Sequence, residues 1–457
     1  MGTNTKSHSL DMLRGSLLRS ILLFALPIAA SSILQQLFNS ADTAVAGKFG
    51  DPDALAAVGT NGEIVALIVS LSAGVAVGAN VLIARCIGAG NRKEIPEAVH
   101  TAMAFSLLFG IGLAVIGQFA AQPLLQLIHT PADILDSAVR YLRVYFAGAP
   151  FLMLYDFGSA VLRAKGDSRR PLGALIFSGV VNVLLNLFFV IVCRLSVVGV
   201  ALATDIATAV SAGFILFWLC REEGDLRFSP RRCRIHGHCL GQILRIGIPA
   251  ALQFAVFCVA NIFVQSAINT FGSAAAAGSA VSMNFEYIAY YVNTAFGQAA
   301  TTFISQNHAA GNRSRCRKIF WLCLVLAVGF SSLIIYPTVL LRAQASGLFS
   351  SSPTEIRYAC ERILIVLSLQ TMCSLYEIPA CTMRGFGYSS LPAAETMLGI
   401  CAVRILWIFT VFAHFRTLKS LYLVFPTTWV ITSVLILVSF VLVCRRVNRA
   451  GYPKKTV

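Results

Sequence analysis

Long apolar stretches alternate with short polar segments along the whole chain. Each stretch is long enough for a helix to cross a hydrocarbon core about 30 Å thick, which takes about 20 residues. The alternation typical of barrel strands is absent from these stretches, so helices are predicted throughout. The pattern predicts twelve membrane-spanning helices, near residues 17–41, 55–85, 97–120, 138–161, 172–193, 197–220, 242–270, 279–304, 318–341, 359–382, 393–415 and 420–444.

The composition supports a membrane protein. Hydrophobic residues make up 57% of the 457-residue chain and charged residues only 12%, whereas a soluble globular chain carries roughly 25% charged residues. So little polarity cannot coat a water-facing surface, and most of the exterior must meet lipid. The expected fold class is therefore all-α, a polytopic protein of the lipid bilayer.

The net charge of +16 could indicate nucleic-acid binding, but the distribution of the charges favours a membrane. Most of the 36 Lys and Arg residues lie in the two termini and in alternate loops between the apolar stretches. Such a bias marks the cytoplasmic side of membrane proteins. We therefore expect both termini in the cytoplasm, in agreement with an even number of spans, and no nucleic-acid partner.

The two halves of the chain repeat each other. The segment LRAKGDSRRP at 162–171 matches MRGFGYSSLP at 383–392, and AGNR occurs at both 89–92 and 310–313. Matches of Arg, Gly and Pro in loops say more than matches between apolar helices, which resemble one another by composition alone. The matched residues, expected as structural hinges or loops, are Arg163, Gly166 and Pro171 in the first half and Arg384, Gly387 and Pro392 in the second.

Each half holds six predicted spans, so both halves enter the membrane from the same side. We therefore expect two six-helix bundles related by a pseudo-twofold axis along the membrane normal, a recurring plan of transporters. The expected domains are an N-lobe at 1–220, a basic cytoplasmic linker at 221–240, and a C-lobe with a cytoplasmic tail at 241–457.

One carboxylate stands at the end of the first apolar stretch. On a helix, Gln35, Asn39 and Asp42 share one face, and a charge inside a bilayer costs roughly 2.5–3.5 kcal/mol on insertion scales. A site for Na⁺ or for a proton would explain the acid, since either ligand neutralises it. The alternative is a polar clamp between helices. Pro27, in the same span, lacks a backbone hydrogen bond and is expected to act as a hinge when Asp42 binds its cation.

Two polar stripes are expected in the C-lobe. Gln370 and Glu377 share one face of a predicted helix, and Glu286 shares a face of another with Tyr290 and Asn293. An acid among tyrosines suits an organic cation through its charge and the ring faces. The alternatives are a structural pair with an arginine and a tyrosine belt near an interface. The candidate substrate-binding residues are Gln35, Glu286, Tyr290, Asn293, Gln370 and Glu377.

Two further features carry polar chemistry. Arg404 lies in the middle of a predicted span, where it is expected to neutralise an acid or to cap carbonyl groups. The basic linker holds Cys233, His236, His238 and Cys239. Zinc is conceivable there, but the spacing matches no strong zinc pattern, and contact with lipid headgroups is the simpler interpretation. We expect no bound metal.

Several motifs together resemble the multidrug and toxic compound extrusion (MATE) family. They are FALPIAASSILQQLFNSADTAVAGKFG, LRAKGDSRRP, NFEYIAYYVNTAFGQAATTFISQN and MRGFGY, and the similarity spans nearly the whole chain. The resemblance implies a two-lobed antiporter of the bacterial plasma membrane, acting as a monomer without a cofactor. Such proteins export small organic, often cationic, compounds in exchange for inward Na⁺ or H⁺.

The resemblance also implies a cation site in the N-lobe. Asp42 occupies the position of the acid on the first helix, Asn182 matches an asparagine on the fifth, and Thr204 matches a threonine on the sixth. Asn186 stands where the family has a second acid, which leaves the ion and its stoichiometry open. Asp205, next to Thr204, could replace that acid. With Asn39, these residues form the candidate cation-coupling set.

Three functions were weighed. Ion-coupled export of organic cations comes first. A flippase for a lipid or a lipid-linked glycan is second, because it predicts a cationic cavity and the spans offer more acids than bases. A membrane-embedded enzyme is not expected, since the spans lack a metal-binding His pair and a convincing Ser/His constellation, and the absence of GxxxxGK[ST] argues against ATP-driven transport.

Overall fold

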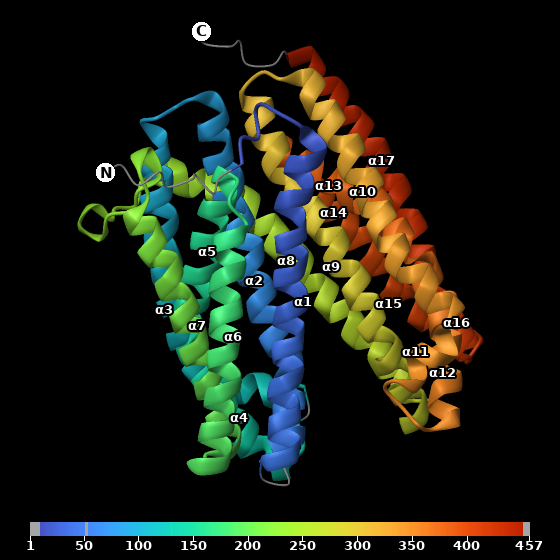
Figure 1. Cartoon of the computed structure of the whole chain (residues 1–457). Helices are drawn as coiled ribbons and strands as arrows, with labels where there is room; N and C mark the ends of the chain where they lie inside the picture. The colour runs from blue at the N-terminus through green and yellow to red at the C-terminus, as the bar shows by residue number, and fades with distance from the viewer. Residues whose placement is uncertain (1–9, 51–53, 129, 451–457) are drawn as a thin grey trace. The chain divides into compact units, whose positions relative to one another are not determined.

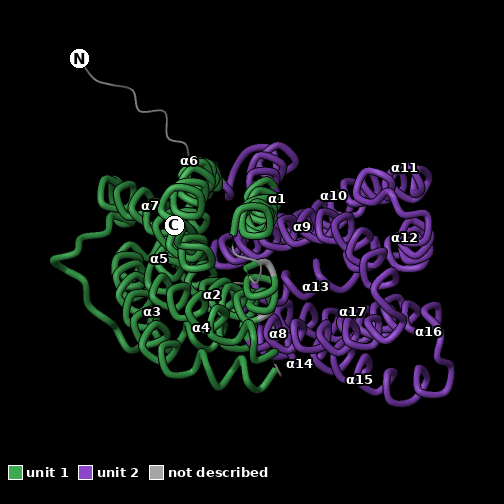
Figure 2. Tube along the Cα trace, turned by 90° about the horizontal axis from the view of Figure 1, so that it is seen from below, with its two compact units in different colours: residues 1–11, 30–251 green, residues 12–29, 252–457 purple. Residues whose placement is uncertain are grey.

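The computed structural model describes residues 10–50, 54–128 and 130–450, and all regular secondary structure among them is helical (Figure 1). The chain divides into two compact units, which Figure 2 distinguishes by colour. The first unit comprises residues 1–11 and 30–251, and the second comprises 12–29 and 252–457. Two of the divisions fall inside the long helices Leu17–Phe49 and Gly237–Asn269, just after Pro27 and Pro249, and Leu26-Pro27 matches Ile248-Pro249 between the halves of the sequence. The lobe and linker boundaries drawn from the sequence stay a prediction, as does the pseudo-twofold axis.

The first unit is a bundle of long helices. Its elements are α1 (Leu17–Phe49, from Ala30 onward), α2 (Ala54–Ala89), α3 (Glu94–Leu127), α4 (Ala132–Ala147), α5 (Ala149–Lys165), α6 (Arg169–Leu187) with a π turn η1 (Phe188–Val192), α7 (Ser196–Arg221), two 3-10 turns η2 (Gly224–Leu226) and η3 (Pro230–Arg232), and the start of α8 (Gly237–Asn269).

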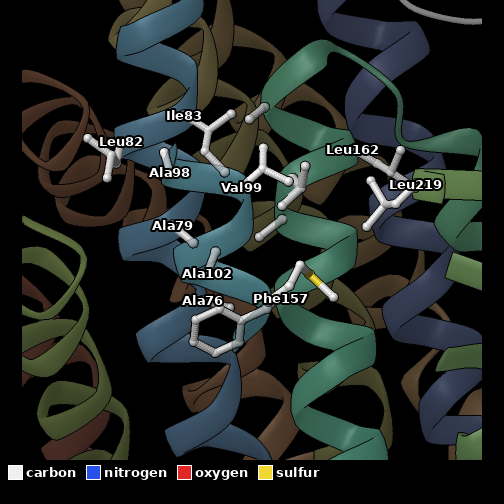
Figure 3. Packing of buried hydrophobic residues seen from close by; sticks show 14 of the residues in the cluster. Ala76, Ala79, Leu82, Ile83, Ala98, Val99, Ala102, Phe157, Leu162 and Leu219 are labelled. Atoms are coloured by element: carbon white, nitrogen blue, oxygen red, sulfur yellow. The ribbon is translucent and has the colours of Figure 1, made fainter. Parts of the chain in front are cut away.

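Small side chains let the helices of the first unit approach closely. Figure 3 shows Ala76 and Ala79 of α2 facing Ala98 and Ala102 of α3, with Phe157 of α5 against them. Small residues at helix contacts are typical of membrane bundles, where packing contacts rather than hydrophobic exclusion hold helices together. Buried residues of α6, α7 and α8 join the same core, so it packs most helices of this unit together.

The second unit contains more broken helices. Its elements are the rest of α8, α9 (Ser273–Ala309), α10 (Arg313–Leu340), α11 (Arg342–Gly347), α12 (Pro353–Ile365), a 3-10 turn η4 (Leu367–Met372), α13 (Cys373–Phe386), α14 (Ser390–Thr396), a π turn η5 (Met397–Ala402), α15 (Val403–Trp407), a π turn η6 (Ile408–Phe412), α16 (Leu418–Tyr422) and α17 (Val424–Ala450). The π turns are wider than an α-helical turn, and such turns inside a helix often mark functional positions.

The number of spans agrees approximately with the predicted twelve. Among the described residues, ten helices are long and apolar enough to cross a membrane, and α4 and α5 add an eleventh if they form one span bent by 45°. The remaining predicted span, 279–304, lies within α9, which is 37 residues long but less apolar. The predicted end of the first span was too early, since α1 continues to Phe49 and holds Asp42 well inside the helix.

The repeat-related loop residues take equivalent backbone positions in the two units. Gly166 ends α5 with φ of +101° and Gly387 ends α13 with φ of +93°, a left-handed conformation that glycine adopts without a Cβ penalty. A Cβ at Gly166 would lie 2.5 Å from the Leu10 carbonyl oxygen. Pro171 accepts a hydrogen bond from the Tyr155 hydroxyl at its carbonyl, and Pro392 accepts one from Thr396.

Candidate ion-coupling and substrate sites

Asp42 is buried between three helices of the first unit. Its side chain is 7% exposed. Asn186 of α6 donates from Nδ2 to Asp42 Oδ1 at 2.5 Å, and Thr204 of α7 donates from Oγ1 to Asp42 Oδ2 at 3.0 Å. Both carboxylate oxygens are therefore held by side chains that come from other helices than α1.

Asn182 completes the network. It lies one helical turn before Asn186 on the same face of α6, accepts from Asn186 Nδ2 at 3.3 Å and donates to Thr204 Oγ1 at 3.3 Å. The Asn186 Oδ1 atom is buried and has no hydrogen-bond partner. A buried acceptor without a donor is costly, so this oxygen is placed to meet a cation or a proton donor beside Asp42.

The carboxylate of Asp42 has no basic neighbour. Within the described part of the chain, no Lys, Arg or His nitrogen lies within 4.0 Å of it, and its hydrogen-bond partners are all neutral. An isolated charge inside a helix bundle is unfavourable unless something neutralises it. Among the described residues, the Asp42 carboxylate is therefore held by neutral hydrogen-bond donors alone.

The structure separates the other predicted coupling residues from this network. The Asp205 carboxyl group faces the backbone amide of Gly148, at the break between α4 and α5. A Cβ at Gly148 would lie 2.0 Å from Asp205 Oδ1, so only glycine leaves room for the carboxylate. Asp205 thus makes its contact on another helix pair than Asp42. Asn39 is exposed and Gln35 is half-buried, and neither donates to Asp42.

In the second unit, Glu286 is held by an arginine. Arg362 of α12 donates from Nε to Glu286 Oε1 at 2.7 Å and from Nη2 to Oε2 at 2.8 Å, and Ser282 donates to Oε1 as well. Such a two-pronged pair is the strongest contact that a carboxylate makes with a side chain. Glu286 is therefore already neutralised, and it is not a free acid for an organic cation. Sequence reasoning missed Arg362 because it placed this residue near the start of a span.

The remaining residues of the two polar stripes also find partners inside the unit. Gln370 Nε2 donates to the Glu286 carbonyl at 2.7 Å, and Ser374 donates to Asn293 Oδ1 at 2.8 Å. Glu377 lies 3.9 Å from Arg384, which is the pairing weighed as the alternative above. Tyr290 stacks against Phe257, and both line a cavity of about 10 Å³ next to Glu377, room for about one water molecule.

Arg404 is a buried cation without an acidic partner. Its side chain is 1% exposed, and Nη1 donates to Asn261 Oδ1 at 2.6 Å. The guanidinium lies over the rings of Phe257 and Phe425, at 5.2 and 4.6 Å from their centroids, contacts that partly offset its desolvation. Among the described residues it neutralises no carboxylate, contrary to one of the two roles expected of it.

Three charged side chains form a cluster of ion pairs at one end of the first unit. Glu222, just after α7, pairs with Lys165 of α5 and with Arg170 of α6. Burial alone would raise the pKa of Glu222, but the hydrogen bonds from Lys165 and Arg170 hold the pKa below its usual value. The cluster ties the ends of α5, α6 and α7 together.

Acid is expected to protonate Glu222 and so to break the ion pairs of this cluster. Because the pKa of Glu222 is lower in the folded chain than its usual value of 4.5, the pair stabilises the fold above that pH and loses its contribution as the pH falls below it. Thermal unfolding of the detergent-purified chain from neutral pH to about pH 3 measures this. The acid loss should be smaller in Glu222→Gln than in the unchanged chain and unaltered in Glu223→Gln, an exposed neighbour. Equal acid loss in all three would contradict the assignment.

The fold and these sites define a class of protein, the polytopic helical membrane transporters. One unit buries a carboxylate whose hydrogen-bond partners are neutral, and the other unit buries arginines and a glutamate–arginine pair. The family model MatE matches residues 27–188 and 249–410, more than half of the chain and once in each half. The chain belongs to this family, the multidrug and toxic compound extrusion transporters, and it is a transporter rather than an enzyme. The expected resemblance is confirmed.

Curated relatives and solved structures agree with this assignment. The chain is 27% identical to the "Probable multidrug resistance protein YoeA" of Bacillus subtilis, over 92% of this chain and 93% of the relative. It is 24% identical to the "FAD transporter" of Shewanella oneidensis, over 86% and 87%. A solved structure described as the outward-facing conformation of a multidrug resistance MATE family transporter superposes with a TM-score of 0.87 at 22% identity, over 98% of this chain and 99% of that one.

Proposed function

We propose that this chain is a secondary active exporter of the bacterial plasma membrane, which moves organic cations outward in exchange for inward H⁺ or Na⁺. Its membership of the family supports multidrug efflux, in line with the names of its relatives. The charge bias of the loops supports cytoplasmic termini. The exporter works as a monomer and needs no cofactor beyond the coupling ion.

One observation carries the coupling mechanism: Asp42 is a buried carboxylate whose partners are all neutral. A structural clamp would be satisfied by an amide at this position, without the cost of a charge. The unpartnered Asn186 Oδ1 beside it offers a further ligand to Na⁺ or an acceptor for a proton carried by Asp42. Either occupant neutralises the site, and its departure restores the charge.

The mechanism follows from the position of Asp42 on α1. Binding or release of the cation changes the contacts that Asp42 makes with Asn186 and Thr204, and so changes how α1 packs on α6 and α7. Pro27 lies in the same helix and leaves a backbone carbonyl without its helical donor, so α1 bends there at low cost. Occupation of the cation site is thereby linked to the exposure of substrate to one side of the membrane or the other.

The test is transport in proteoliposomes that hold the full chain, with pH and Na⁺ gradients imposed separately. A cationic dye should be transported against its concentration gradient under one of the two ion gradients. Without either ion gradient, no net transport of the dye against its concentration gradient is expected. The gradient that drives the dye identifies the coupling ion. Dye movement that is independent of both gradients would overturn antiport but would leave the fold and family untouched.

A second candidate function is movement of an anionic compound, such as a lipid-linked one. Arg404 favours it, because this buried guanidinium is paired with an amide and two rings instead of an acid. Proteoliposomes that carry an anionic fluorescent lipid analogue separate the two candidates. Movement of the lipid alone would favour the flippase, and movement of the dye alone would favour the exporter of organic cations.

A further inference from the structure

Three side chains with metal-binding chemistry meet at one end of the first unit. Glu94 at the start of α3 and His238 and Cys239 at the start of α8 each offer one ligand atom, and these atoms all lie within 4.8 Å of one another. Cys86, near the end of α2, is a fourth candidate: its thiol lies outside this 4.8 Å group but interacts electrostatically with Glu94 and Cys239. The set plays no part in the proposed transport.

The linker brings this set together by docking on α3. The Ser229 amide donates to His100 Nε2 at 3.1 Å, and the His236 amide donates to Thr101 Oγ1 at 3.0 Å. His236 and Cys233 therefore lie against α3, with Cys233 Sγ 4.0 Å from the His100 carbonyl oxygen. The four linker residues weighed for zinc from the sequence are thus divided, since only two of them face Glu94.

The chemistry of the set suits zinc. Two thiolates, an imidazole and a carboxylate are all common ligands of tetrahedral Zn²⁺. Cys86 and Cys239 are buried, whereas the His238 side chain is 75% exposed, which gives an ion a path from water. Asn91 Nδ2 donates to Glu94 Oε2 at 2.8 Å and Gln242 contacts His238 Nε2 at 3.0 Å. Outer contacts of this kind orient metal ligands.

We propose that Cys86, Glu94, His238 and Cys239 bind one Zn²⁺, which fastens the start of α8 to the turn between α2 and α3. On binding, the Cys86 side chain moves toward the other three ligands, both thiols release their protons to water, and each sulfur forms a bond to the metal beside the Glu94 carboxylate and the His238 imidazole. With two thiolates, one carboxylate and a neutral imidazole the occupied site carries one net negative charge, and no oxidant or reductant takes part.

The experiment uses the full chain, purified in detergent and stripped with a chelator. Zn²⁺ alone is added back, excess is removed, and bound zinc per chain is measured by elemental analysis. We expect one zinc per chain in the unchanged protein and in the matched controls Cys233→Ser and His236→Gln, which alter the linker residues that face α3. Cys239→Ser and His238→Gln should lose most of the zinc.

Two further measurements keep the proposal testable if a variant folds poorly. Co²⁺ in place of zinc should give the visible absorption of a tetrahedral site together with a thiolate charge-transfer band. Zn²⁺ should also slow the alkylation of Cys86 and Cys239 in the unchanged chain, with Cys233 unaffected. Zinc that does not bind, or binds equally in Cys239→Ser, or alkylation that ignores the metal, would overturn the proposal and show a hydrogen-bonded packing cluster instead.

Discussion

Replacement of Asp42 by asparagine should lower ion-driven efflux by about tenfold or more. Asparagine keeps the size of the side chain and can still hydrogen-bond to Thr204 and Asn186, but it cannot release and rebind a cation. A hydrogen bond to a charged group is worth about 1.5–3 kcal/mol, which corresponds to a tenfold to hundredfold change in cation affinity. The measurement is dye transport in proteoliposomes under the driving ion gradient, at matched protein content.

Two further variants, one on α1 and one on α6, separate coupling from folding. Asn39→Ala alters an exposed residue one turn away and should transport at the unchanged rate. Asn186→Asp restores an acid beside Asp42 and should shift the dependence on the coupling ion without abolishing transport. If Asp42→Asn exported dye at the unchanged rate, Asp42 would be a structural clamp and the proposed coupling site would be wrong.

Breaking the pair between Glu286 and Arg362 should destabilise the second unit strongly. The Arg362 side chain is 3% exposed and the Glu286 side chain 12%, so Arg362→Met leaves an uncompensated carboxylate inside the bundle. Removal of one partner of a buried pair costs about 3–5 kcal/mol. The expected result is a large drop in the unfolding temperature of the detergent-purified chain.

A double variant tests whether the unpaired charge causes the loss of stability. Glu286→Gln together with Arg362→Met removes both charges, so most of the lost stability should return. Arg357→Met, on the same helix, removes an exposed arginine and should change stability little. A double variant no more stable than Arg362→Met alone would show that packing of the arginine over Tyr422 and Phe425, and not the ion pair, stabilises this region.

The two units keep a common helix plan but carry different charges inside. Asp42 and Asp205 have no basic partner within 4.0 Å among the described residues, whereas the second unit buries Arg362, Arg384 and Arg404. Near the start of each half the offset of the repeat is 222, as the match of Phe49-Gly50 with Phe271-Gly272 shows, so Val264 corresponds to Asp42. Duplication therefore preserved the loop residues that shape the chain, while the polar positions within the helices diverged.

The fold class and the candidate residues could be predicted from the sequence, whereas the contacts between those residues could not. Hydropathy, loop charges and the internal repeat were enough to predict an all-helical membrane protein in two halves, because lipid demands long apolar helices and the positions of Arg, Gly and Pro in loops survive duplication. The residues Asp42, Asn182, Asn186 and Thr204 were named from the resemblance. Their common network required the packing of α1, α6 and α7.

Only the tertiary structure decided which polar residues are free. Glu286 and Asp42 look alike along the chain, as single acids among polar neighbours. Yet Arg362, 76 positions away, neutralises Glu286, whereas no basic side chain among the described residues lies within 4.0 Å of Asp42. In the same way, Glu94 joins His238 and Cys239 only because the linker folds back on α3. Periodicity within one helix specifies the face on which a side chain lies, but the group that meets that face comes from a distant helix, and its identity follows from packing.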